Sequence, residues 1–116
     1  QKSGQQMSAA QRKKLEQGKL DIDARLDLHG LTLAVAHDKL MRFVLAQYRK
    51  KARCLLVITG KGARDETGKG QGVIRKNLPH WLETPDMAPL VLSLIEAHAQ
   101  HGGSGAFYLY LRRQAA

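Results

Sequence analysis

The sequence predicts an α/β fold, an α+β two-layer sandwich in which two helices lie on a mixed four-stranded sheet in the order βαβαββ. Three observations support this prediction. Apolar and polar residues alternate over residues 20–29, an apolar stripe with helical spacing follows over 33–50, and residues 54–58 are all apolar. A strand, a helix and a buried strand in succession favour a right-handed crossover between parallel strands.

The first strand lies in the alternating segment, where apolar residues occupy every second position from Leu20 to Leu28. Such alternation is typical of a half-buried strand, and we expect the ordered strand in its second half, ending at Gly30. Thr32 can then cap a helix over residues 33–50 by accepting a hydrogen bond from a free backbone N–H. The residues expected along the inward stripe of this helix are Leu33, Ala36, His37, Leu40, Val44 and Gln47.

The rest of the domain is expected to contain three strands and one helix. The continuous apolar run over 54–58 is typical of a strand covered on both faces. A second helix is predicted over 73–83, and Pro79 should kink or split it because proline lacks the N–H that a helix interior requires. Two strands, 90–97 and 106–112, follow and are joined by a glycine-rich hairpin connection. The inward residues of the second helix are expected to be Val73, Ile74, Leu78, Trp81 and Leu82.

Length and composition indicate one small domain. The 116 residues suffice for one compact domain, which we assign to residues 21–116, preceded by a basic N-terminal arm at 1–20. The arm is expected to be partly disordered with a short helix over about 9–17. The single cysteine, Cys54, excludes an intrachain disulfide and suits a buried thiol in a reducing compartment, which favours a cytoplasmic location. No apolar stretch has the length of a membrane span.

The charge of the chain indicates a polyanionic partner. Nineteen Lys and Arg against ten Asp and Glu give a formal net charge of +9. Residues 1–20 hold five basic residues and one acidic residue, a net charge of +4. A domain this basic usually binds DNA, RNA or an acidic membrane surface. A basic surface that serves only solubility is the alternative.

Asp27 and His29 form the first candidate site. Residues two apart in a strand point the same way, about 6–7 Å apart, and this pair lies at the carboxyl end of its strand, where open α/β sheets bind ligands. Such a pair can act in general acid/base catalysis, with Asp27 orienting or charging His29. The alternative is a surface strand that includes both residues by chance, and the D-x-H spacing alone does not separate the two interpretations.

The glycine-rich loop after residue 58 is the second candidate site. Glycines let backbone N–H groups turn toward an anion, and the N-terminus of the next helix adds partial positive charge. The sequence therefore favours phosphate binding over a flexible loop with incidental lysines. It does not match a Walker A loop, because Gly70 stands where Ser or Thr should follow Lys69. The residues assigned to this site are Thr59, Gly60, Lys61, Gly62, Arg64 and Lys69.

The third candidate site is the run His101-Gly102-Gly103-Ser104-Gly105. Its glycines suit a hairpin turn, and His101 at the start of such a turn can still reach a ligand across the sheet edge. The five histidines and one cysteine of the chain show no spacing typical of a zinc site, so we expect no bound metal among them.

Three motifs in order, LDLHG at 26–30, ITGKG at 58–62 and HGGSGAFYL at 101–109, together resemble the Smr (small MutS-related) domain. The resemblance covers residues 24–113 and includes GVIRKNLPHWL at 72–82, which is similar to the family's second helix, with Arg75 as its basic residue. It implies a fold similar to the C-terminal domain of translation initiation factor 3. With a short basic arm and no room for an ATPase, the chain looks like a stand-alone bacterial form of this domain.

The resemblance also implies endonuclease activity: nicking or cleavage of branched DNA in some members, and cleavage of RNA on stalled ribosomes in others. By this resemblance, Asp27 and His29 match the residues most often implicated in cleavage. The family's glycine-lysine loop is matched by Lys61 and Gly62, and its third motif by His101, Gly102 and Gly103. The residues expected to act in catalysis are Asp27, His29 and His101, and those expected to bind phosphate or nucleic acid are Gly30, Thr59, Gly60, Lys61, Gly62, Arg64, Lys69, Arg75, Gly102, Gly103 and Gly105.

The hypothesis from the sequence is therefore cleavage of phosphodiester bonds in RNA or branched DNA by acid/base catalysis. RNA carries its own nucleophile in the 2′-OH, whereas DNA needs an attacking water and normally a metal such as Mg²⁺ or Mn²⁺. A single obvious carboxylate favours RNA. A non-catalytic RNA- or ribosome-binding module is the first alternative, and a small-molecule phosphotransfer enzyme, which lacks its nucleotide fingerprint here, is the second. A monomer is favoured, and no membrane partner is expected.

Overall fold

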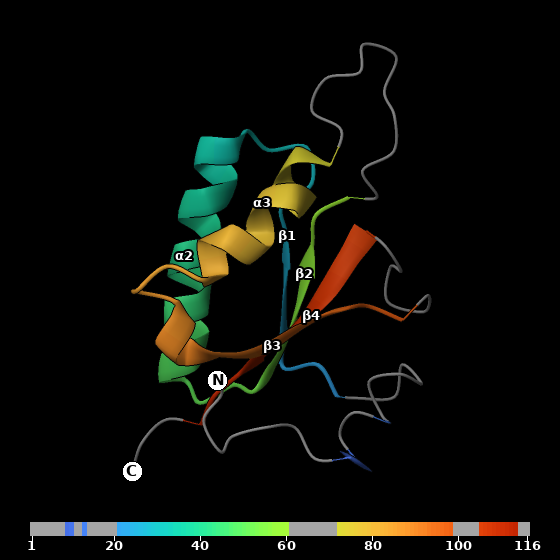
Figure 1. Ribbon diagram of the computed structural model, residues 1–116, viewed down its shortest axis with the longest axis vertical. Helices are drawn as coiled ribbons and strands as arrows, with labels where there is room; N and C mark the ends of the chain where they lie inside the picture. The colour runs from blue at the N-terminus through green and yellow to red at the C-terminus, as the bar shows by residue number, and fades with distance from the viewer. Residues whose placement is uncertain (1–8, 11–12, 14–20, 61–71, 99–104, 114–116) are drawn as a thin grey trace.

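The computed structural model describes residues 9–10, 13, 21–60, 72–98 and 105–113, and its elements follow the predicted order (Figure 1). A short 3₁₀ turn, η1, precedes the third strand and was not predicted. Of the short helix expected over about 9–17, Ala9, Ala10 and Lys13 are described, and all three are helical. The elements of the domain are β1 (Ala24–Asp27), α2 (Leu33–Arg49), β2 (Cys54–Ile58), α3 (Val73–Leu82), η1 (Ala88–Leu90), β3 (Val91–Glu96) and β4 (Ala106–Leu111).

The sheet is mixed, as predicted, and its strand order is β1-β2-β4-β3. β1 runs parallel to β2, while β4 runs antiparallel to both β2 and β3. In register, Asp27 lies opposite Ile58, and Ile58 lies opposite Ala106. The carboxyl ends of β1 and β2 therefore meet the amino end of β4 at one end of the sheet, and β1 and β3 form its two edges.

Helix α2 supplies the crossover between β1 and β2. Thr32 caps it as expected, because its hydroxyl accepts a hydrogen bond from the Val35 N–H at 3.3 Å. Ala36, Leu40 and Val44 are buried, whereas Leu33 is 40% exposed, so the expectation that Leu33 faces the core is wrong. Figure 1 shows the start of α2 extending past the ends of β1 and β2, where its first turn no longer lies over the sheet.

The far end of α2 closes through a residue in the left-handed conformation. Lys51 has a φ of +69° and follows the C-cap Lys50. The Ala52 N–H donates to the Gln47 carbonyl and the Lys51 N–H donates to the Tyr48 carbonyl, both at 3.0 Å. These two bonds form a Schellman motif, which usually contains glycine at the position that Lys51 occupies.

Pro79 was predicted to kink or split this helix, and it does not split it, because α3 runs unbroken from Val73 to Leu82. Proline removes one helical bond, the one to the Arg75 carbonyl. Pro79 is exposed, so the carbonyl of Arg75 that loses its helical partner lies on the outer side of the helix. On the inner side, Leu78 and Leu82 are buried and hold the helix against the core. Burial of each such leucine contributes about 1.5–3 kcal/mol.

Buried side chains cover both faces of the sheet. The larger cluster lies between the sheet and both helices and includes Leu55 and Val57 of β2. The smaller cluster on the opposite face includes Cys54 and Leu56 of the same strand, together with Tyr108. The prediction that β2 is covered on both faces is thus confirmed. Burial raises the pKa of the Cys54 thiol to about 12, so this cysteine stays protonated and unreactive.

No helix within the described parts of the chain is long and apolar enough to span a membrane.

Candidate active site

Asp27 and His29 lie against each other at the end of β1. The Nδ1 atom of His29 is 2.6 Å from Oδ1 of Asp27, and the backbone N–H of His29 donates to the same oxygen at 3.0 Å. The second hydrogen bond closes an Asx-type turn, which holds the side chain of Asp27 against the backbone of His29. Leu28 between them is fully buried and anchors the turn in the core. The structure thus brings the two residues of the D-x-H motif into one hydrogen-bonded pair.

The pairing decides which ring nitrogen of His29 can meet a ligand. Because Nδ1 contacts the carboxylate, Nε2 is the atom that can exchange a proton with a bound molecule. The two side chains are accessible, with His29 67% exposed and Asp27 51% exposed. The hydrogen bond from His29 lowers the pKa of Asp27 below its ordinary value, so the carboxylate is ionised at neutral pH and stabilises positive charge on the ring.

Glycines from the three sequence motifs meet beside this pair. Gly30 follows His29 directly with a φ of +78°, and Gly60 follows β2 with a φ of +88°. A Cβ atom on Gly60 would lie 3.4 Å from Cβ of His29, so the two backbones approach closely. The carbonyl of Gly105 accepts hydrogen bonds from the N–H groups of Thr59 at 2.9 Å and Gly60 at 3.1 Å. The ends of β1, β2 and β4 therefore assemble one site.

Thr59 ties this assembly together from the inside. Among the described residues, Thr59 is the one polar residue that is buried, with 6% of its surface exposed. Its hydroxyl donates a hydrogen bond to the carbonyl of Gly60 at 3.1 Å, and the carbonyl of Gly105 is a second acceptor at 3.5 Å. The hydroxyl of Thr59 therefore donates within the protein, to the backbone of the two glycines at this end of the sheet.

Arg75 lies at the same end of the sheet, in the first turn of α3. Its guanidinium lies 5.4 Å from the centre of the Phe107 ring on β4, and its Nη2 atom is 3.5 Å from a carboxylate oxygen of Glu96. Phe107 pairs with Val57 on the helix side of the sheet, whereas Asp27 pairs with Ile58, which packs on the opposite side, so Arg75 lies at the same end of the sheet as Asp27 but over its other face. Sequence reasoning missed Glu96 and Phe107, because their contact with Arg75 depends on the antiparallel register of β3 and β4.

Seven of the predicted site residues lie outside the described residues. They belong to segments 61–71 and 99–104. The described residues on either side of these segments lie at the end of the sheet that holds Asp27 and His29 (Figure 1). They are Gly60 and Gly72 for the first segment and His98 and Gly105 for the second. Within the described residues, no three His, Cys, Asp or Glu side chains gather to hold a metal ion. The seven residues are Lys61, Gly62, Arg64, Lys69, His101, Gly102 and Gly103.

Two ribosome rescue factors are similar to this chain in sequence. SmrB of Haemophilus ducreyi is 32% identical over 101 residues, which cover 87% of this chain and 51% of that protein. SmrB of Yersinia enterocolitica is 34% identical over 95 residues, which cover 81% of this chain and 47% of that protein. The chain therefore spans about half the length of these relatives.

Two solved structures share the fold. YdaL, a stand-alone small MutS-related protein from Escherichia coli, superposes with a TM-score of 0.73 at 27% identity, covering 97% of this chain and 82% of YdaL. The Smr domain of Thermus thermophilus MutS2 superposes with a TM-score of 0.62 at 24% identity, covering 77% of this chain and 98% of that domain.

The sequence model of one family spans the sheet, both helices and the candidate site. This model, described as the Smr domain, matches residues 26–112, from within β1 to the residue after β4. The match includes Asp27 and His29 and extends past Gly105. The chain belongs to the Smr domain family.

Proposed function

We propose that this chain is an endonuclease that cleaves RNA by acid/base catalysis at His29. The observation that carries the proposal is the 2.6 Å contact between His29 Nδ1 and Asp27, which leaves Nε2 of an exposed side chain for the substrate. An exposed imidazole held by a carboxylate through one nitrogen is the arrangement that general acid/base catalysis requires.

The chemistry follows from this geometry. Nε2 of His29 accepts the proton of a ribose 2′-OH, and the 2′ oxygen then attacks the neighbouring phosphorus atom. The bond from phosphorus to the 5′ oxygen breaks, and that oxygen takes up a proton. This leaves a 2′,3′-cyclic phosphate on one fragment and a 5′-OH on the other. Asp27 stabilises the imidazolium that forms, and such proton transfer typically accelerates a reaction by about 10²–10⁴-fold.

The surrounding motifs would hold the phosphate. Backbone N–H groups and cations that face the growing charge stabilise a transition state. We assign this task to the glycine loop with Lys61 and to Arg75, and the delivery of the second proton to His101. In the sequence, Lys61 directly follows Gly60, and His101 precedes Gly105 by four positions.

RNA is favoured over DNA by the groups at the site. Cleavage of DNA by water normally calls for a metal ion such as Mg²⁺ or Mn²⁺. The described residues place a single carboxylate, Asp27, beside His29, which suits metal-independent use of the 2′-OH. The similarity to ribosome rescue factors supports a ribosome-associated RNA in the cytoplasm as the substrate.

The test is cleavage of end-labelled single-stranded RNA and branched DNA, with Mg²⁺ or with EDTA. We expect RNA cleavage that persists in EDTA, falls by at least about 10²-fold in His29→Ala, and leaves a cyclic phosphate end. His80→Ala is the matched control, because His80 is an exposed histidine on α3 away from the pair. Cleavage of branched DNA only with metal would refute the RNA mechanism, and binding without cleavage of either substrate would favour the non-catalytic module.

A further inference from the structure

The outer face of α2 has the composition of a binding surface. All three large apolar side chains that are exposed in the described residues lie on this helix: Leu33, Val35 and Leu45. Four exposed basic residues accompany them: Lys39, Arg42, Arg49 and Lys50. Val35 is 45% exposed and Leu45 is 38% exposed, so this face offers apolar as well as cationic contacts.

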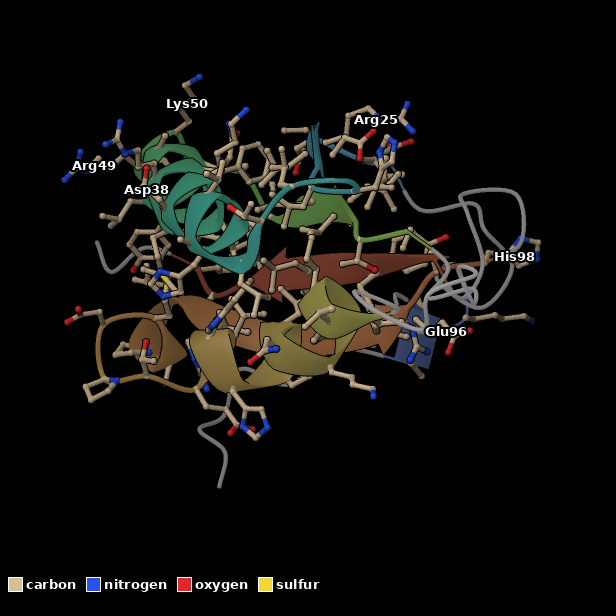
Figure 2. The ribbon with its side chains drawn as sticks, turned by 90° about the horizontal axis from the view of Figure 1, so that it is seen from above. Arg25, Asp38, Arg49, Lys50, Glu96 and His98 are labelled. Carbon is tan, nitrogen blue, oxygen red and sulfur yellow. The ribbon has the colours of Figure 1, made fainter. Side chains whose placement is uncertain are left out.

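The basic residues form a line along the helix axis. Lys39, Arg42 and Arg49 are spaced by three and seven residues, which places them on one face of a helix. Figure 2 shows Arg49 and Lys50 projecting from the end of α2 away from the sheet, whereas Arg25 of the edge strand β1 lies on the other side of that strand from α2. Residues 38–51 contain five basic residues and one acidic residue, Asp38, a net charge of +4.

The helix that carries this line of charge begins next to the candidate active site, and its first basic residue, Lys39, is the seventh residue of the helix. Thr32, the N-cap of α2, is separated from His29 by two residues. The helix has 17 residues and therefore extends about 25 Å from that point. Stacked nucleotides place a phosphate about every 3.4 Å, so the helix matches the length of about seven nucleotides.

We propose that the strand bound at His29 continues along the outer face of α2, with its phosphates on Lys39, Arg42, Arg49 and Lys50. Charge complementarity supports a phosphate backbone as the occupant, and the exposed Val35 and Leu45 provide apolar contacts for ribose and base. This proposal rests on the proposed function, because it identifies the path of the same substrate. The α2 surface is expected to affect the affinity for RNA, whereas His29 is expected to affect the rate of cleavage.

The path makes binding depend on RNA length. A single strand of about 4 nucleotides covers roughly 14 Å and occupies only the site, whereas about 12 nucleotides cover the site and the helix. Each phosphate contact contributes about 0.7 to the slope of log binding constant against log salt concentration for a single strand. Removing two contacts lowers this slope by about 1.4, which weakens binding about 25-fold at 0.1 M salt relative to 1 M. We therefore expect Lys39→Gln with Arg49→Gln to weaken the longer RNA about 25-fold and the shorter RNA hardly at all.

Two further kinds of substitution complete the test: one that removes a negative charge from α2, and controls on another surface. Asp38 is 60% exposed on the same face and pairs with Arg42 at 3.2 Å, so Asp38→Asn should tighten binding of the longer RNA. Lys76→Gln and Glu83→Gln are the matched controls, because both residues are exposed on or next to α3. Neither control should change the dependence of affinity on RNA length. All variants are measured by fluorescence anisotropy at several salt concentrations, after circular dichroism confirms folding.

The outcomes separate this proposal from the proposed function. Equal weakening of short and long RNA by the α2 variants, or an equal effect of Lys76→Gln, would overturn the path along α2 even if His29→Ala abolishes cleavage. Length-dependent weakening by the α2 variants supports the path even if no RNA is cleaved. Binding of the full chain to phosphatidylserine vesicles that is lost in the α2 variants, with RNA binding unchanged, would assign the face to a membrane and overturn the proposal.

Discussion

Substitution of Gly60 by alanine tests whether the backbone beside His29 requires glycine. Gly60 has a φ of +88°, in the region where a Cβ atom collides with the following carbonyl. This strain costs about 1–2 kcal/mol for a residue with a side chain. The new methyl group would lie 3.4 Å from Cβ of His29, an ordinary van der Waals contact, so it adds little further cost. We expect Gly60→Ala to lower the free energy of unfolding by about 1–2 kcal/mol.

Gly30 provides a matched control for this variant. Its φ is +78°, and apart from its two chain neighbours nothing lies within 4 Å of the position that a Cβ would occupy. Gly30→Ala therefore carries the same backbone strain, and we expect a similar loss of stability. The two variants should differ in function, because the methyl group at Gly60 reaches His29 from a neighbouring strand end, whereas at Gly30 it meets nothing beyond its own chain neighbours. The methyl group at Gly60 narrows the space beside His29 in which the substrate must be positioned, so we expect Gly60→Ala to lose at least about tenfold in RNA cleavage.

Urea denaturation followed by circular dichroism gives the stability of both variants, and cleavage of end-labelled RNA under conditions where each is folded gives the activity. An unchanged midpoint for Gly60→Ala would show that the positive φ carries no strain. Equal loss of cleavage in both variants would show that proximity to His29 is not what distinguishes Gly60.

Three further predictions concern the core, a helix end and pH. Leu40→Ala should destabilise the fold by about 2–5 kcal/mol in urea denaturation, because Leu40 is fully buried beneath α2. Lys51→Gly should raise stability by about 0.5–1 kcal/mol, since it relieves a left-handed lysine; an unchanged melting temperature would argue against that strain. The folded state lowers the pKa of Asp27, so its contribution to stability is present above the unfolded pKa of about 3.9 and is lost as the pH falls through the folded pKa. Asp27→Asn should remove this acid-range dependence in pH-resolved denaturation, by a small amount because the carboxylate is half exposed.

The local pattern of the chain was enough to predict most of the elements. The alternation that ends at Gly30, the stripe of Ala36, Leu40 and Val44, and the apolar run of β2 each repeat with the period of one element, and all three predictions are confirmed. The resemblance to the Smr domain, inferred from three short motifs, is confirmed by the family match over residues 26–112.

Local patterns failed where a residue's environment is set by other elements. Leu33 continues the apolar stripe of α2 but lies beyond the end of the sheet, so it is exposed. Pro79 has the wrong propensity for a helix interior, yet Leu78 and Leu82 on either side are buried and keep α3 intact. Neither outcome can be read from periodicity, because periodicity reports the face of a residue and not what lies opposite that face.

By itself, the sequence determined that the chain has a βαβαββ order, a strongly basic charge and an Asp-x-His pair at a strand end. Only the tertiary structure decided that β4 lies between β2 and β3, because strand order depends on contacts between residues far apart in the chain. That order brings Gly105 onto Thr59 and Gly60, and Gly60 against His29. It also places Arg75 over Phe107. The site is therefore a product of strand pairing, in which hydrogen bonds across the sheet assemble residues that are separated by up to 78 positions.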